Sequence, residues 1–355
     1  MSEPKVPAVI LGASGYVGGE LLRLLAGHPG FELAAAVSQS HAGEPIAETF
    51  PHLAGTLNGA RFATADGWRA QLAGTKRWAL LSAAPHGSSA VAVGEALAEA
   101  RKQGEEVAVV DLSADFRFAN AADYATTYGH AHPLPSLTEA FVSAVPEHWA
   151  DATTPRLVAH PGCFTTAALL AIVPLLKLKL AEPTFAITAI TGSTGSGRTP
   201  TEKTHHPSRR SNVAAYSPLA HRHAPEMRAI AKVVTGVDPE IAFVPVSGPQ
   251  ARGIYLSLHG RLTAPRTTAG LVEALAAFYE SSPFVAVSAE PPSLTEVVGT
   301  NRARIGVTAV GESISVTVAI DNLVKGAAGG AIQWLNRMHG FDERAGLDLP
   351  GLGWF

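Results

Sequence analysis

Short hydrophobic runs alternate with amphipathic stretches along the first half of the chain, and this pattern predicts a parallel α/β domain. Apolar runs of strand length lie at residues 6–11, 31–37, 78–84, 107–112 and 156–159. Between them, residues 20–26 and 88–103 carry apolar positions at helical spacing. Strands that alternate with helices form parallel sheets with right-handed crossovers, and ligands collect beyond the carboxyl ends of such strands.

The second half of the chain has a different pattern, because most of its strands follow one another without helices between them. A long apolar helix is predicted over residues 163–180 and another helix over residues 267–280. Strand patterns lie at residues 185–190, 241–246, 253–262, 284–287, 304–310 and 313–320. Strands in succession are typical of an antiparallel or mixed sheet. A last helical pattern, residues 326–339, has an apolar face suited to docking onto the first domain.

These patterns predict two domains of different class. We expect a Rossmann-type parallel-sheet domain that binds NADP over residues 1–162, completed by a C-terminal helix within residues 325–355. The second domain, residues 163–324, is expected to have an α+β fold with a mixed or antiparallel sheet, and to carry catalysis and oligomerisation.

Composition narrows the functional classes. The 355 residues are 46% hydrophobic and 16% charged with a net charge of −3, so no general attraction to nucleic acid or to a membrane surface is expected. A single cysteine argues against a disulfide framework and suits a reducing compartment. Apolar runs do not reach membrane-spanning length, and Met1–Pro7 lacks the apolar core of a signal peptide. We therefore expect a cytoplasmic protein.

A glycine-rich turn follows the first predicted strand directly. The sequence Gly12-Ala-Ser-Gly-Tyr-Val-Gly18 separates that strand from the helical pattern at residues 20–26. Strand, glycine turn and helix form the context of a dinucleotide-binding motif, because glycines let the backbone approach a pyrophosphate and the helix start supplies N–H groups. A tight turn without a ligand is the alternative. We assign to the cofactor site Gly12, Ser14, Gly15, Tyr16 and Val17.

The residues after the second predicted strand favour NADP over NAD. An acidic residue there would hold the ribose hydroxyls of NAD. The chain instead has Ser38-Gln-Ser-His41, which offers hydroxyl donors and no carboxylate to repel a 2′-phosphate. Further candidates for the NADP(H) site lie at the end of the strand run 78–84. The full set is Ser38, Ser40, Ser82 and Pro85.

The only cysteine, Cys163, lies at a predicted strand-to-helix turn. Helix starts carry unpaired N–H groups and the positive end of the helix dipole, which both favour the nucleophilic thiolate over the thiol. A lone cysteine is more commonly a small buried hydrophobic residue. Gly162 before it, and the polar Thr165 and Thr166 after it, favour a reactive thiol.

Histidines and arginines supply candidate partners for that thiol. A histidine near the sulfur, either His221 or His223, could accept and return protons. Arg117 follows a predicted strand and is a candidate anion clamp, with a surface salt bridge as its ordinary alternative. Paired histidines also bind zinc, but no cysteine or compact carboxylate cluster accompanies this pair, so no metal site is expected. A structural role as a helix cap near Pro225 is credible for one of the two.

Two further segments carry candidate binding groups. A second glycine-rich turn, residues 191–198, suggests close backbone approach to a ligand, with a flexible loop as the plain alternative. The irregular stretch 199–220 is basic, and loops of this length are usually functional or mobile. Together, a nucleotide-binding half, a thiol, histidines and anion clamps predict that a thiolate attacks an activated acyl group and that hydride from NADPH reduces the thioester to an aldehyde. Backbone N–H groups at the helix start could hold the oxyanion.

Six segments, in one order along nearly the whole chain, resemble the motifs of a known family. They are Gly12–Gly18, Asp111–Arg117, His160-Pro-Gly-Cys163, Gly192–Arg198, His221-Arg-His-Ala-Pro-Glu226 and Lys325-Gly-Ala-Ala-Gly-Gly-Ala-Ile-Gln333. With these motifs the chain resembles the N-acetyl-gamma-glutamyl-phosphate reductases of arginine biosynthesis, which are relatives of aspartate-semialdehyde dehydrogenase. Gly330 stands where members of that family commonly carry a bulkier polar residue.

This resemblance implies NADPH-dependent reduction of N-acetyl-L-glutamyl 5-phosphate to N-acetyl-L-glutamate 5-semialdehyde and phosphate. Cys163 would be the nucleophile and His223 the acid–base group, with His221 close by. From the same motifs we expect the substrate to contact Arg117, Arg198, Tyr216 and Glu226. The remaining cofactor contacts are expected at Ser193, Gly195, Asn322 and Gly326. The resemblance also implies a homodimer or homotetramer formed through the second domain.

Alternatives stay open at this point. One is a reductase for the aminoadipyl phosphate of lysine biosynthesis, or for a substrate carried on a protein, because one methylene changes binding by only about 1–3 kcal/mol. Another is an enzyme that acts like aspartate-semialdehyde dehydrogenase. A non-catalytic NADP-binding regulator and a dehydrogenase without a covalent step are the others.

Overall fold

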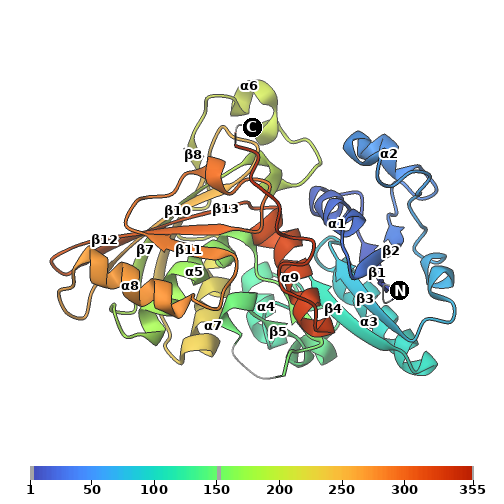
Figure 1. Ribbon diagram of the computed structural model, residues 1–355, viewed down its shortest axis with the longest axis horizontal. Coiled ribbons are helices and arrows are strands. Elements are labelled where there is room, and N and C mark those ends of the chain that lie inside the picture. Colours follow the sequence, from blue (N-terminus) through green and yellow to red (C-terminus); the bar gives the residue numbers. More distant parts are fainter. Residues whose placement is uncertain (1–3, 150–152, 354–355) are drawn as a thin grey trace. The chain divides into compact units, whose positions relative to one another are not determined.

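The computed structural model describes residues 4–149 and 153–353, which form two compact units (Figure 1). The first unit comprises residues 1–143, 151–160 and 328–348, and the second comprises 144–150, 161–327 and 349–355. Of the described residues, 144–149 and 349–353 thus group with the second unit. Residues 1–3 and 354–355, the ends of the segments Met1–Pro7 and 325–355 discussed above, lie outside the described residues, as do residues 150–152.

The first unit is built on a six-stranded, fully parallel sheet, which confirms the predicted Rossmann-type class. Its strands are β1 (Val6–Leu11), β2 (Phe31–Val37), β3 (Arg77–Ser82), β4 (Glu106–Asp111), β5 (Val142–Ser143) and β6 (Leu157–Ala159). They lie in the order β2-β1-β3-β4-β6-β5. The chain reverses direction across the sheet between β1 and β3, and parallel sheets bind ligands at such a switch point.

Helices α1 (Tyr16–Ala26), α3 (Ser88–Gln103) and α9 (Gly329–His339) pack against this sheet. The first unit also contains α2 (Ile46–Thr49) and α4 (Ala121–Tyr128), whose buried residues are Ile46 and Tyr124. The buried stripe of α3, which includes Val93 and Ala96, shares one core cluster with Val9 of β1 and Leu80 of β3. This helix ends at Gly104 in the left-handed conformation, where glycine carries no Cβ penalty.

The second unit contains a seven-stranded mixed sheet, as the succession of strands predicts. Its strands are β7 (Thr184–Thr191), β8 (Ala214–Ala215), β9 (Glu240–Ser247), β10 (Ile254–Arg261), β11 (Val285–Ser288), β12 (Ala303–Val310) and β13 (Ser313–Ile320). They lie in the order β11-β12-β13-β10-β7-β9-β8. The pairs β7–β9 and β11–β12 are parallel and the other pairs are antiparallel.

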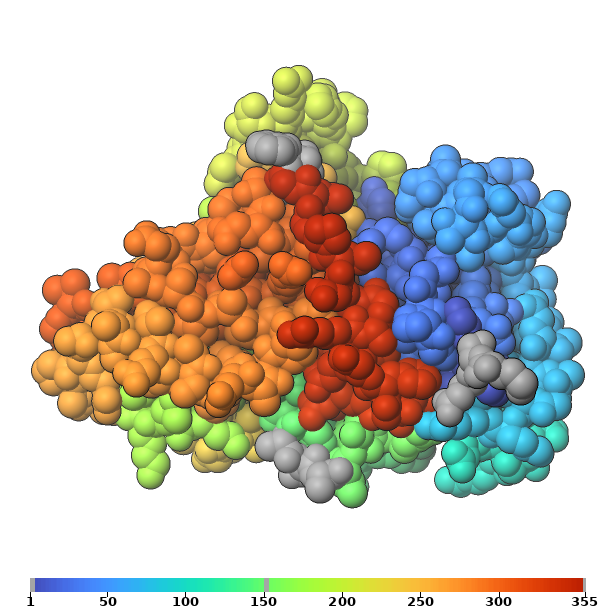
Figure 2. Space-filling model, in the orientation of Figure 1, coloured from blue at the N-terminus to red at the C-terminus, as the bar shows by residue number. Residues whose placement is uncertain are grey.

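Three helices cover one face of this sheet (Figure 1). They are α5 (Cys163–Lys177), α7 (His223–Thr235) and α8 (Thr268–Phe278). Every residue of α5 from Phe164 to Leu176 is buried, so this helix forms the centre of the core. In Figure 2, α8 forms one continuous surface with β11 and β12. The basic stretch 199–220, with its short helix α6 (His206–Arg209), projects from the second unit in both views.

Two local features differ from the helical pattern. For α7 the pattern predicts only a start near Pro225 and not the end of the helix. For the C-terminal region it predicts one continuous helix from residue 326. In the structure a π-helix, Val324–Ala328, precedes α9. None of the helices in the described ranges is long and apolar enough to cross a bilayer.

Candidate active site

Cys163 is the first residue of the 15-residue helix α5, and it is half-buried. Its N-cap, Gly162, has no side chain that could bond to the first N–H groups of the helix. Those groups and the positive end of the dipole are therefore directed toward the region of the thiol. Cysteines at helix starts are generally shifted toward the thiolate form, which makes Cys163 a candidate nucleophile.

Glu226 fixes the backbone immediately before the cysteine. Its carboxylate Oε1 accepts the N–H of Gly162 at 2.7 Å, and Glu226 is completely buried. The carbonyl of Gly162 in turn accepts the N–H of Thr166 at 2.8 Å, which closes the first turn of α5. Glu226, expected from its motif to contact substrate, therefore links α7 to the start of α5.

His221 and His223 lie beside the residue that follows the cysteine. Their ring centroids are 4.7 Å apart, and each lies 5.8 Å from the ring of Phe164. The N–H of His223 donates to Nδ1 of His221 at 3.2 Å. In neutral His221 the proton is therefore on Nε2, because Nδ1 already acts as an acceptor. Tyr216 completes the cluster, with its ring centroid 5.5 Å from that of His221.

Burial controls the protonation of this cluster. It lowers the pKa of His221 to about 4, and the positive charge of Arg222 lowers it further, so His221 is neutral at pH 7. Burial also raises the pKa of Tyr216 well above its ordinary value, and the charge of Cys163 adds to this effect. Tyr216 thus lies within electrostatic range of the thiol and stays protonated.

Gly326 forms the surface against which the cysteine packs. A Cβ atom placed on Gly326 would lie 2.7 Å from Cβ of Cys163 and 3.1 Å from its Cα, which leaves no room for a side chain. The N–H of Gly326 donates to the carbonyl of Asp321 at 2.9 Å, across the five-residue span of a π-turn. The structure therefore brings Gly326, expected from its motif at the nicotinamide, into contact with Cys163.

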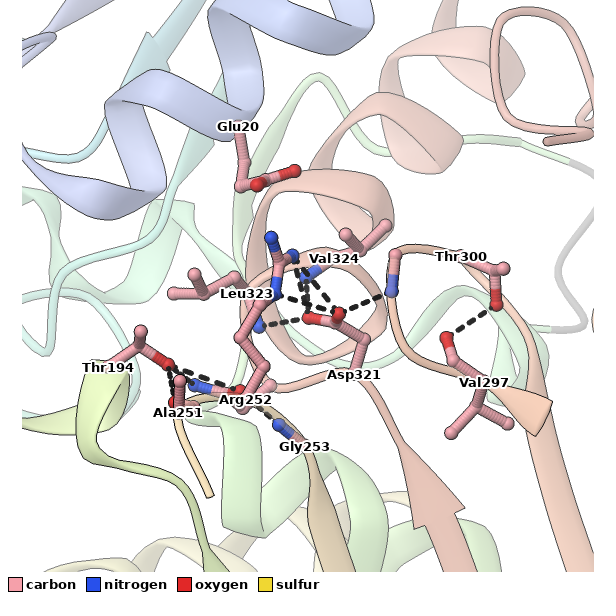
Figure 3. A network of polar contacts seen from close by, with 12 residues as sticks. Glu20, Thr194, Ala251, Arg252, Gly253, Val297, Thr300, Asp321, Leu323 and Val324 are labelled. Carbon is pink, nitrogen blue, oxygen red and sulfur yellow. Dashed lines mark hydrogen bonds and ion pairs between the residues drawn. The ribbon is translucent and has the colours of Figure 1, made fainter. Parts of the chain in front are cut away.

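Asn322 connects the second glycine-rich turn to this region, and its partners Thr194 and Gly253 are labelled in Figure 3. Its Oδ1 accepts the N–H of Gly253 at 2.7 Å, and its Nδ2 donates to Thr194 Oγ1 at 3.1 Å. Thr194 Oγ1 donates to the carbonyl of Ala251 at 2.7 Å. The turn that contains Ser193 is thereby held next to Asn322. The other two candidates on this segment, Gly195 and Arg198, are exposed.

Arg209 is a site candidate that the sequence analysis left without a role. Its Nη2 donates to the carbonyl of Thr191 at the end of β7 at 3.2 Å, and its Nη1 bonds to Ser247 Oγ at the end of β9. The charge of Arg209 also lowers the pKa of Tyr216, opposing the effect of burial. A positive charge therefore reaches the cluster around the thiol, which no local motif indicates.

In the first unit, the glycine turn after β1 fits a dinucleotide. Gly12 has φ +69°, and a Cβ atom on it would lie 2.5 Å from the carbonyl oxygen of Ala83. A Cβ atom on Gly18 would lie 2.4 Å from the carbonyl oxygen of Ala13. Gly15 is the N-cap of α1 and has no side chain to occupy its first N–H groups. The turn thus presents backbone N–H groups without obstructing side chains, as a pyrophosphate requires.

Hydroxyl groups link this turn to the end of β2. Ser38 Oγ donates to Ser14 Oγ at 2.8 Å and lies 3.5 Å from Ser40 Oγ. The sequence analysis did not consider Arg61. Its Nη1 donates to the carbonyl of Gly43 at 2.7 Å, so an arginine side chain reaches the loop that follows β2. These groups could contact a 2′-phosphate.

The other cofactor candidates have different environments. Tyr16 is exposed and Val17 is half-buried on the first turn of α1. Ser82 is completely buried, and its hydroxyl bonds to Ser89 Oγ at 2.6 Å. The carbonyl of Pro85 accepts N–H groups at the start of α3. Ser82 and Pro85 therefore contribute hydrogen bonds within the fold at the end of β3.

Arg117 is anchored to the backbone beside the cysteine motif. It is 8% exposed, and it donates from Nε to the carbonyl of His160 at 3.1 Å and from Nη2 to the carbonyl of Leu112 at 2.8 Å.

A Cβ atom on Gly330 would lie 2.3 Å from Cε1 of His160. The ring of His160 thus occupies the space of the bulkier side chain expected at Gly330.

No group of three or more histidine, cysteine, aspartate or glutamate side chains in residues 4–149 and 153–353 is arranged to hold a metal ion.

Comparisons with known protein families and solved structures identify the same two domains and the fold. Residues 7–154 match the family model described as the NAD binding domain of semialdehyde dehydrogenase, and residues 163–322 match its dimerisation domain. The chain has the same fold as aspartate semialdehyde dehydrogenase II from Vibrio cholerae, with a TM-score of 0.67 over 95% of this chain and 99% of that chain, at 18% identity.

Much higher identity is found with curated reductases. The chain is 39% identical to N-acetyl-gamma-glutamyl-phosphate reductase of Dehalococcoides mccartyi, over 97% of this chain and 98% of the relative. It is 38% identical to the same enzyme of Rhodospirillum rubrum, over 99% of each. It is also 38% identical, over 98% of each, to a protein of Aeropyrum pernix described as a putative LysW-L-2-aminoadipate/LysW-L-glutamate phosphate reductase. On these identities and this coverage, the chain belongs to the N-acetyl-gamma-glutamyl-phosphate reductase family.

Proposed function

We propose that this protein reduces N-acetyl-L-glutamyl 5-phosphate to N-acetyl-L-glutamate 5-semialdehyde and phosphate, with NADPH as the reductant. The observation that carries this proposal is the position of Cys163 at the start of α5, against Gly326, with His221 and His223 packed on the adjacent Phe164. The 37–39% identity to curated reductases over nearly the full length supports the substrate assignment.

The proposed chemistry uses the thiolate of Cys163 as a nucleophile. Its sulfur forms a bond to the acyl carbon, the bond from that carbon to the phosphate oxygen breaks, and inorganic phosphate leaves. NADPH, when bound, supplies the hydride that reduces the resulting thioester. Collapse of the reduced adduct then releases the aldehyde and restores the thiolate. N–H groups at the start of α5 stabilise the oxyanion.

The histidine pair handles the protons. His223 is buried, and its position beside Phe164 suits an acid–base group that takes a proton from the thiol and returns one to the departing group. Neutral His221 orients it through the backbone bond at Nδ1. Arg117, Arg198 and Arg209 are the candidate contacts for the anionic groups of the substrate.

We also propose the cofactor contacts and the assembly. Gly12, Ser14 and Gly15 would hold the pyrophosphate, and Ser38, with Ser40 and Arg61 nearby, would hold the 2′-phosphate that distinguishes NADP from NAD. A homodimer or homotetramer is supported by the dimerisation description of the family model that matches residues 163–322. A cytoplasmic location is supported by the single cysteine.

A second candidate substrate is an aminoadipyl or glutamyl phosphate carried on a protein. The 38% identity to the Aeropyrum pernix protein supports it, because that value almost equals the identity to the arginine-pathway reductases. Turnover of N-acetyl-glutamyl phosphate, measured side by side with aminoadipyl and glutamyl phosphates carried on a protein, separates the two: a kcat/KM ratio above about tenfold for the acetylated glutamyl compound supports the first proposal.

The test of the mechanism is phosphate-dependent reduction of NADP with N-acetyl-glutamate semialdehyde, followed by the absorbance of NADPH. Cys163→Ser should abolish the reaction while NADPH binding, measured by fluorescence titration, stays intact. Wild-type turnover in Cys163→Ser would refute the thioester mechanism. Mass spectrometry of the wild-type enzyme with acyl phosphate and without NADPH should detect acylated Cys163.

A further inference from the structure

We propose that the ion pair between Arg252 and Asp321 positions Cys163 for reaction, by holding the π-helix Val324–Ala328 against the cysteine. Neither residue is expected to touch substrate or cofactor, so both are positioning residues. The inference rests on the proposed function, because it assigns Cys163 as the reacting group.

The carboxylate of Asp321 is the centre of the network in Figure 3. Asp321 is completely buried, and its Oδ1 accepts the N–H groups of Leu323 and Val324 at 2.8 and 2.9 Å. Its Oδ2 accepts the N–H of Gly299 at 2.7 Å. Arg252 adds a bidentate contact, from Nε to Oδ2 at 3.1 Å and from Nη2 to Oδ1 at 3.2 Å. A carboxylate with this many donors is fixed in one orientation.

The same residue defines the π-turn. The carbonyl of Asp321 accepts the N–H of Gly326 at 2.9 Å, so one end of the turn is tied to the residue that carries the ion pair. Gly326 packs directly on Cys163, at the 2.7 Å approach described above. A π-turn is rare and is frequently found at functional sites. Movement of Asp321 would therefore be transmitted through Gly326 to the cysteine.

A second buried pair holds the turn at Lys325, the residue before Gly326. The ammonium of Lys325 pairs with the carboxylate of Glu147, and both side chains are completely buried. The ammonium also lies 5.8 Å from the ring centroid of Phe284. Removing one partner of such a pair leaves an unpaired buried charge and is strongly destabilising, so Lys325 is a poor choice for a test. Arg252, whose side chain is 21% exposed, is the better choice, because the carboxylate of Asp321 keeps its three backbone N–H donors when Arg252 is replaced.

A purely structural role makes a different prediction from a positioning role. If the Arg252–Asp321 pair only stabilises the fold, its loss lowers the unfolding free energy but leaves the reactivity of each folded thiol unchanged. If it positions Cys163, the thiol of the folded protein reacts more slowly and at a different pH. The rate of alkylation of Cys163 by iodoacetamide, measured from pH 6 to 10, reports this directly because the protein contains one cysteine.

The experiment compares three variants of the full chain. Arg252→Met removes the pair, and Arg252→Lys keeps the charge but not the bidentate geometry. Arg261→Met is the matched control, since Arg261 lies at the other end of β10 and forms an exposed ion pair with Glu312. We expect Arg252→Met to lower kcat and the alkylation rate by at least about tenfold, because a shift of 1 Å at a reacting group can cost about a hundredfold. KM should change by less than about twofold, Arg252→Lys should recover part of both rates, and the control should match wild type.

Two results would overturn the inference. One is wild-type kcat and alkylation in folded Arg252→Met. The other is a raised KM with unchanged kcat, which would make Arg252 a ligand contact. If Arg252→Met does not fold, Gly326→Ala replaces it: the added methyl group should slow alkylation by a similar factor with the ion pair intact, and a wild-type rate there would overturn the inference. Alkylation needs no substrate, so this result is independent of whether Cys163→Ser abolishes turnover.

Discussion

A half-buried histidine of the second unit, His148, should make the protein sensitive to acid. Nε2 of His148 lies 3.1 Å from Oη of Tyr279, and that hydroxyl donates to the carbonyl of Leu170 at 2.7 Å. The hydroxyl is thus the acceptor from His148, so the proton of neutral His148 is on Nε2. Although the residue is only half-buried, its Nδ1 is buried and has no hydrogen-bond partner within residues 4–149 and 153–353.

Protonation of His148 would add a proton to Nδ1, where no group of the described residues accepts it, and would leave a cation in a desolvated position. Burial lowers the pKa of His148 to about 3, and the charges of Lys325 and Lys177 lower it further, while Glu147 acts in the opposite direction. In the unfolded chain the pKa returns to 6.5. Between these values the unfolded state binds a proton that the folded state does not, so stability is complete above pH 6.5 and falls as the pH decreases toward 3.

The magnitude follows from proton linkage. Each pH unit below 6.5 costs about 1.4 kcal/mol of unfolding free energy, which amounts to about 2 kcal/mol from His148 between pH 7 and pH 5. This loss is large against the usual stability of a protein domain, about 5–15 kcal/mol.

The assay is urea unfolding at pH 7 and pH 5, followed by circular dichroism, for wild type and His148→Gln. Glutamine keeps a donor for Tyr279 and does not titrate. The loss of stability between the two pH values should be about 2 kcal/mol smaller in His148→Gln than in wild type. The control is His259→Gln, an exposed histidine of the same unit, which should retain the full wild-type loss. Equal losses in wild type and His148→Gln would refute the reasoning.

Three further substitutions test the packing around the two candidate sites. Glu226→Ala leaves the buried N–H of Gly162 without its acceptor, so it should lower both kcat and the unfolding free energy, the latter by about 1–3 kcal/mol. Glu226→Gln keeps the accepting oxygen, and equal urea midpoints for the two variants would contradict this role. Gly330→Ala places a methyl group against the edge of the His160 ring and should cost about 1–3 kcal/mol in urea unfolding. A wild-type midpoint would contradict this close packing. Gly12→Ala should weaken NADPH binding in a fluorescence titration. A left-handed backbone costs a residue with a side chain about 1–2 kcal/mol, and the added methyl group would meet the backbone of Ala83 and Ala84 after β3, so the turn should change shape. An unchanged Kd would show that the turn does not approach the cofactor.

Features encoded over a few neighbouring residues could be predicted from the sequence. The strands at residues 6–11, 31–37 and 313–320 and the helix at 88–103 have the predicted bounds, because alternation, apolar runs and glycine stops are local signals. The start of α5 at Cys163 could also be predicted, because a strand pattern, a proline–glycine pair and a helical pattern follow one another there.

Only the tertiary structure decided which distant residues meet. Arg252 and Asp321 are 69 positions apart, and Lys325 and Glu147 are 178 positions apart, so neither partner carries a signal of the other. The π-helix before α9 was likewise hidden, because its residues fit an ordinary helical pattern and only the packing of Gly326 on Cys163 and the bonds to Asp321 select the wider turn. The sequence by itself thus determined most of the elements and named Cys163 as the candidate nucleophile. The supports of that thiol depend on side chains brought together by folding, since hydrogen bonds and ion pairs act over a few ångströms in space, whatever the separation along the chain.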